Sequence, residues 1–100
     1  MFQAMRPSEA LKAHRAELRS IVARHGGLRP RIFGSAVRGE DTEESDLDLL
    51  IDPTHRTTLM TLATIQIEAE RLLGVRVDVM TPRSLPAKLR EQALLEALPV

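Results

Sequence analysis

Two carboxylates and a glycine–serine turn form the most informative pattern in the chain. Asp46 and Asp48 are one residue apart, and Gly34-Ser35 precedes them with ten residues between Ser35 and Asp46. In a strand, residues i and i+2 point to the same face, so the two carboxylates stand side by side. Such a pair repels unless a cation lies nearby, and hard divalent ions prefer oxygen ligands. The pattern predicts a phosphate-binding turn beside a carboxylate metal clamp, which suits nucleotide chemistry.

A third carboxylate, Asp78, lies in a later strand-like segment. Residues 75–79 alternate strictly, which places the valines on the core face and Asp78 on the opposite face. If the turn and Asp46 share a site, the end of the first strand meets the start of the second, and these strands run antiparallel. Because Asp78 lies late in the third strand, we expect that strand to run antiparallel to the second as well.

The elements that must position these residues follow from apolar periodicity and from cap and turn signals. We expect Ser8 to cap the first helix and Gly26-Gly27 to end it. The expected helices span 8–25, 35–38, from 57 or 58 to 73, and 84–98, and the expected strands span 28–33, 47–51 and 75–79. This order predicts one α+β domain over residues 1–100, with a small mixed sheet of about three strands packed against about four helices.

The segment between the turn and the paired acids is polar and rich in carboxylates. It holds Glu40, Asp41, Glu43 and Glu44. We interpret it as a solvated acidic loop, because charged residues in a connecting segment most often face water.

Composition excludes several functional classes. The 14 basic residues balance the 14 acidic ones, so we expect no general nucleic-acid-binding surface. The chain has two aromatic residues, both phenylalanine, and no cysteine, which excludes disulfides and thiolate metal sites and disfavours a base-stacking platform. No signal peptide or transmembrane-length apolar run is evident, so we expect a cytoplasmic protein without a membrane partner.

The combined motifs resemble the nucleotidyltransferase superfamily that includes DNA polymerase beta. The resemblance rests on residues 31–51, on the strand-borne Asp78 within 77–82, and on their spacing. The absence of a further domain makes the chain similar to the minimal nucleotidyltransferases, which are often antitoxin partners of HEPN-domain toxins. The resemblance implies transfer of a nucleotidyl group, most plausibly from ATP, to a hydroxyl of such a partner.

The resemblance also implies a catalytic role for each acid. Asp46 and Asp48 would bind two Mg²⁺ ions, and Asp78 would complete the metal site and take the proton of the acceptor hydroxyl. All three are therefore the expected catalytic and metal-binding residues.

A second set of residues is expected to bind the nucleotide. Ser35 would donate a hydrogen bond to a β- or γ-phosphate oxygen, helped by the backbone N–H groups that follow Gly34. Arg38 would add positive charge near the leaving group. Gly34 itself would allow the backbone to approach the phosphates closely.

Two other functions stay open. The chain can be a non-catalytic antitoxin that blocks its partner by complex formation, because Ala36 replaces the larger side chain that many relatives carry after the serine. It can also modify a small molecule, as aminoglycoside nucleotidyltransferases do, although little chain remains to hold such an acceptor. DNA synthesis is disfavoured by the neutral charge and the lack of a template-binding region.

Overall fold

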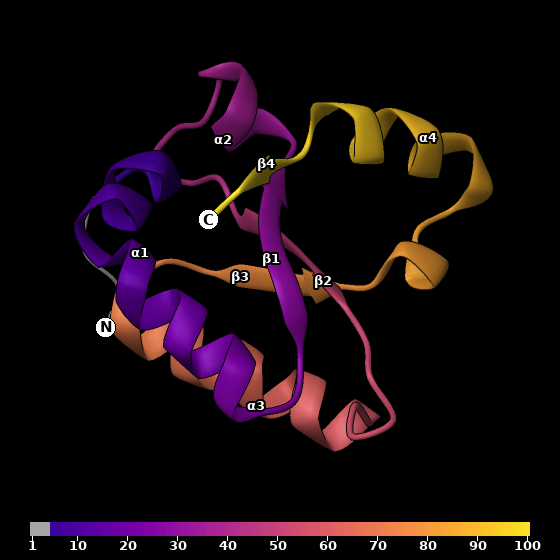
Figure 1. The fold of residues 1–100 in the computed structure, drawn as a ribbon. Coiled ribbons are helices and arrows are strands. Elements are labelled where there is room, and N and C mark those ends of the chain that lie inside the picture. Colours follow the sequence, from indigo (N-terminus) through magenta and orange to yellow (C-terminus); the bar gives the residue numbers. More distant parts are fainter. Residues whose placement is uncertain (1–4) are drawn as a thin grey trace.

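A computed structural model describes residues 5–100 of the chain. Within this range, four α-helices, one 3₁₀ turn and a four-stranded sheet alternate along the sequence (Figure 1). In chain order, the elements are α1 (Pro7–Arg24), β1 (Leu28–Phe33), α2 (Ser35–Arg38), β2 (Leu47–Asp52), α3 (Leu59–Leu73), β3 (Val77–Met80), the 3₁₀ turn η1 (Pro82–Ser84), α4 (Ala87–Glu96) and β4 (Leu98–Pro99). The predicted α+β class with a mixed sheet is confirmed.

The sheet has the order β3-β2-β1-β4. β1 runs antiparallel to β2, as predicted, and Phe33 at its end lies opposite Asp48. β3 runs parallel to β2, so the predicted antiparallel pairing of these two strands is wrong. The strand begins at Val77 instead of Val75, which makes Asp78 an early residue of β3 and brings it beside Asp48 in the parallel arrangement. The intervening α3 provides the crossover that parallel neighbours require.

A short fourth strand was not predicted. The last helix ends at Glu96, before the expected Leu98, and the chain then extends so that Leu98 pairs with Ile32 of β1. Two residues are too few for an alternation to be recognised in the sequence. The consequence is that the segment after α4 is attached to the same strand that leads into the Gly34 turn.

The two faces of the sheet are covered by different helices. On one face, α1 and α3 pack side by side over the main core (Figure 1). Leu47, Leu49 and Ile51 of β2 are fully buried there, while Leu50 points to the other face and packs with Ala93 of α4. None of the helices within residues 5–100 combines the length and apolar character needed to cross a bilayer.

The acidic loop is not wholly solvated, because Asp41 is buried, with 4% of its surface exposed. Its Oδ2 accepts a hydrogen bond of 2.9 Å from the backbone N–H of Ser8. The expected capping role of Ser8 is therefore wrong: α1 begins at Pro7, Arg6 is the N-cap residue, and a distant carboxylate satisfies one of the free N–H groups of the first turn. This contact anchors the loop to α1 just before the loop reaches Asp46.

Candidate active site

The structure brings the three predicted acids to one end of the central strands. Asp46 directly precedes β2, Asp48 is the second residue of β2, and Asp78 is the second residue of β3. Asp48 and Asp78 are partners in the parallel register, and neighbouring strands lie about 5 Å apart. Asp46 and Asp48 are partly buried, while Asp78 is exposed. A ligand can therefore reach the acids from solvent.

Mutual repulsion marks this cluster. The pKa of Asp48 is raised from 3.8 to about 6. Burial is the largest cause, and the negative charges of Asp78 and Asp46 follow. The pKa of Asp78 is also raised, first by burial and then by the charges of Asp46 and Glu70. An arrangement in which carboxylates oppose one another's ionisation gains stability when a cation is bound between them.

The donor chemistry of this cluster fits magnesium. Three carboxylates supply the oxygen ligands that Mg²⁺ takes, and water and substrate phosphates usually complete its octahedron. The side chains do not form a ready-made cage: among residues 5–100, no group of three or more carboxylate or imidazole side chains is close enough together to hold a metal ion. Binding of an ion by Asp46, Asp48 and Asp78 would therefore require their side chains to move closer together.

The Gly34 turn lies directly against the acids. Gly34 has φ of +79° and ψ of −151°, a conformation that L side chains rarely adopt. A Cβ atom at this position would collide with the Oδ2 atom of Asp48. The glycine thus has a structural reason that the sequence did not show: its missing side chain allows the turn and the carboxylate to touch. Ser35 follows as the first residue of α2.

A further acid, Glu96, takes part in the same arrangement and was missed by the sequence interpretation. Its Oε1 accepts a hydrogen bond of 2.8 Å from the N–H of Gly34. Its two carboxylate oxygens also accept bonds of 3.1 and 3.2 Å from Nη1 of Arg38. The Nε of Arg38 donates to Glu40 at 2.7 Å. Arg38 is therefore held next to the turn through a residue 58 positions away, which no local signal could reveal.

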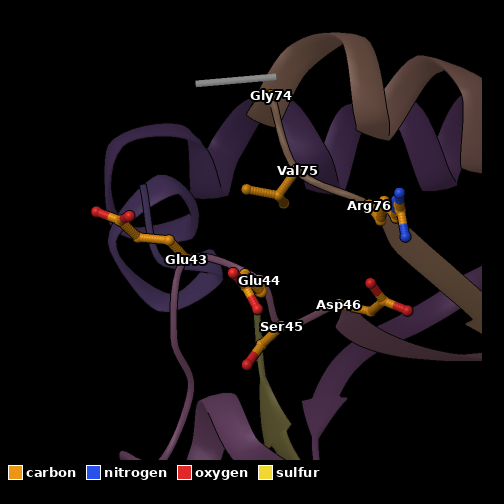
Figure 2. A pocket seen from close by; sticks show the side chains of 7 residues that line it. All are labelled: Glu43, Glu44, Ser45, Asp46, Gly74, Val75 and Arg76. Atoms are coloured by element: carbon orange, nitrogen blue, oxygen red, sulfur yellow. The ribbon is translucent and has the colours of Figure 1, made fainter. Parts of the chain in front are cut away.

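A pocket of about 470 Å³ opens beside Asp46. Figure 2 shows it between the segment that leads into β2 and the segment that leads into β3. Its lining residues are Glu43, Glu44, Ser45, Asp46, Gly74, Val75 and Arg76. The lining contains three carboxylates and a single guanidinium, so a positively charged group is the ligand that it favours. The sequence did not predict this pocket, because it joins segments about thirty residues apart.

A mixed sheet with a glycine–serine turn at the end of β1 and with acids at the start of the parallel pair β2 and β3 is the architecture of a minimal nucleotidyltransferase. The family model described as "Nucleotidyltransferase domain" matches residues 11–100, and the chain belongs to this family.

The comparisons with individual proteins agree with this assignment. A protein of Thermococcus cleftensis named protein adenylyltransferase MntA is 38% identical over 88 residues, which cover 88% of this chain and 86% of that protein. A solved structure named as that of a minimal nucleotidyltransferase superposes with a TM-score of 0.83 at 48% identity, and it covers 93% of this chain and 95% of the other. A toxin–antitoxin structure with AMP-PNP shares the fold, with a TM-score of 0.72 at 16% identity, covering 84% of this chain and 69% of the other.

Proposed function

We propose that this chain transfers an adenylyl group from ATP to a hydroxyl of a partner protein. The observation that carries the proposal is the pairing of Asp48 with Asp78 in the parallel register. Asp48 lies two residues after Asp46 in the chain, and it contacts the Gly34 turn. The Thermococcus cleftensis relative, which is named a protein adenylyltransferase, supports the same reaction.

The three acids divide the chemistry between them. Asp46, Asp48 and Asp78 would hold magnesium, which when bound neutralises the triphosphate and lowers the pKa of the acceptor hydroxyl. The acceptor oxygen attacks the α-phosphorus, the bond from that phosphorus to the bridging oxygen breaks, and pyrophosphate leaves. Asp78 is the exposed acid on the outer strand, and we assign to it the proton of the hydroxyl.

The turn at the end of β1 would hold the triphosphate. Ser35 directly follows Gly34, which lies against Asp48, and Arg38, held by Glu96, brings a guanidinium close enough to lower the pKa of Asp48. A guanidinium that faces the β- and γ-phosphates stabilises the charge that develops on leaving pyrophosphate. Gly34, Ser35 and Arg38 are thus the proposed nucleotide-binding residues.

The strand order separates the side of the site that would bind the triphosphate from the side that would bind the acceptor. The triphosphate side lies on β1, the acids lie on β2 and β3, and the pocket beside Asp46 lies on the β3 side. The acceptor therefore approaches from that pocket. Its carboxylates, Glu43 and Glu44, favour an acceptor hydroxyl that is carried on a basic protein segment. We propose a HEPN-domain toxin as the partner, in agreement with the family resemblance.

A labelled transfer experiment tests the proposal. The purified chain is incubated with magnesium, ATP labelled at the α-phosphate, and the toxin candidate encoded beside it, and the toxin is then examined for label. We expect transfer by the wild-type chain and none by the Asp46→Asn/Asp48→Asn variant. Glu91→Gln, an exposed acid of α4 outside the site, is the matched control. Equal labelling by all three proteins, or by none of them, would overturn the proposal.

A binding-only antitoxin is the second candidate, because several large apolar side chains are exposed. On α3, Leu59, Met60 and Ile67 are 86%, 77% and 50% exposed. Such exposure on a helix is suited to a protein partner. Co-expression separates the two functions: if the Asp46→Asn variant still neutralises the toxin, binding alone is sufficient, and if it stays bound without neutralising, transfer is required.

A further inference from the structure

Glu96 is fixed in place by contacts on its C-terminal side. It is the last residue of α4, and β4 begins two residues later as the edge neighbour of β1. The N–H of Val100 donates to the carbonyl of Pro30 at 3.0 Å, and Nη1 of Arg19 donates to the carbonyl of Val100 at 3.1 Å. The backbone around Glu96 is therefore held against the strand that ends in the Gly34 turn.

The carboxylate of Glu96 acts on two groups at once. It accepts from the N–H of Gly34 and from the guanidinium of Arg38, and its side chain is only 19% exposed. A free arginine side chain loses rotamer entropy when it becomes ordered. Because Glu96 and Glu40 already restrict Arg38, much of this cost is met before a ligand arrives.

We propose that Glu96 is a positioning residue for the nucleotide. It fixes the Gly34 turn and directs Arg38, and it thereby makes the affinity for the triphosphate depend on the segment formed by α4 and β4. This inference rests on the proposed function and extends it to a residue that does not itself touch the substrate.

The opposite role, in which Glu96 competes with a phosphate, is less consistent with the contacts. Glu96 uses the N–H of Gly34, whereas the hydrogen bonds found among residues 5–100 leave the N–H groups of Ser35 and Ala36 without an acceptor. An anion that binds Ser35 can therefore enter while Glu96 stays in place. The two roles predict opposite effects when Glu96 is removed.

Binding of magnesium ATP to the full chain decides between them. Calorimetry compares wild type, Glu96→Ala, Glu96→Gln and the matched control Glu91→Ala, with circular dichroism as the check on folding. We expect Glu96→Ala to weaken binding about 5- to 10-fold, the size of one net hydrogen bond. The Gln variant keeps an oxygen for the Gly34 N–H, so we expect only about a 2- to 3-fold loss.

Two further readouts separate positioning from a general structural role. In the transfer reaction, the KM for ATP should rise and kcat should fall for Glu96→Ala but not for Glu91→Ala, because Arg38 both binds the triphosphate and stabilises the charge on the leaving pyrophosphate. The double variant Glu96→Ala/Arg38→Ala should bind more tightly than the product of the two single losses predicts, since Glu96 acts in part through Arg38. The inference is overturned if Glu96→Ala binds magnesium ATP as tightly as wild type, or more tightly. If wild type itself fails to bind, the proposed function fails together with the inference.

Discussion

Asp48 should destabilise the protein when no metal is bound, and replacing it with asparagine should make the metal-free chain more stable. Its pKa is raised from 3.8 to about 6, by burial first and then by the charges of Asp78 and Asp46. At about 1.36 kcal/mol per pKa unit, a fully buried group would cost about 3 kcal/mol when ionised. Since Asp48 is only half-buried, solvent screening reduces the expected gain from Asp48→Asn to about 1 to 2 kcal/mol at pH 7.5.

The pH dependence follows from the direction of this shift. A pKa that is raised on folding means that the folded state binds the proton more tightly than the unfolded state. The contribution of Asp48 is therefore fully favourable below pH 3.8 and is lost as the pH rises to about 6. We expect the wild-type protein to lose stability across this window and the Asp48→Asn variant to lose much less.

Urea denaturation in EDTA, followed by far-ultraviolet circular dichroism, measures both effects. The chain has no tryptophan or tyrosine, so circular dichroism replaces intrinsic fluorescence. In thermal melts, the gain corresponds to a Tm increase of about 5 to 10 °C for a domain of this size. Saturating Mg²⁺ should stabilise the wild type and reverse the order, since a ligand stabilises the state that binds it. The reasoning is refuted if Asp48→Asn is no more stable than wild type in EDTA at pH 7.5, with Glu91→Gln as the control for removing an acid.

Three other changes test neighbouring parts of the structure. Gly34→Ala should cost about 1 to 2 kcal/mol of folding free energy, because alanine is strained at positive φ and its Cβ meets Asp48; an unchanged urea midpoint would contradict this. Asp41→Ala should cost about 1 to 2 kcal/mol by leaving the Ser8 N–H without its acceptor, and Asp41→Asn should cost less. Glu43→Lys/Glu44→Lys should slow toxin labelling at least about tenfold while leaving magnesium ATP affinity within about threefold; an equal loss of both would place these acids on the nucleotide side.

Local signals were sufficient to predict most elements and the central residues of the site. The strand-like apolar run in residues 47–51 and the glycine before Ser35 predicted β2 and the turn. Thr57 or Thr58 was expected to start α3, and Thr58 is its N-cap residue, whose hydroxyl accepts from the Thr61 N–H at 3.1 Å. These signals act within a few residues, so the chain displays them directly. The nearness of Asp46 and Asp48 followed from the period of a strand in the same way.

Long-range contacts could not be predicted in this manner. Strand direction was inferred from where Asp78 falls in its segment, and a shift of two residues in the start of β3 was enough to reverse the conclusion. Asp41 and Glu96 look like ordinary charged residues in the sequence, because their partners Ser8 and Gly34 lie 33 and 62 positions away. Burial of Asp41 and the short pairing of β4 depend on tertiary packing, which single-sequence patterns do not describe.

The attachment of β4 to β1 also sets an order in which the site is assembled during synthesis. The acids and the Gly34 turn are complete once residue 80 has been made, but Glu96 and its anchor at Val100 emerge later. A nascent chain thus acquires its charge cluster before the contact that organises Arg38. The contact that holds Arg38 beside the Gly34 turn is thus a property that only the last segment adds.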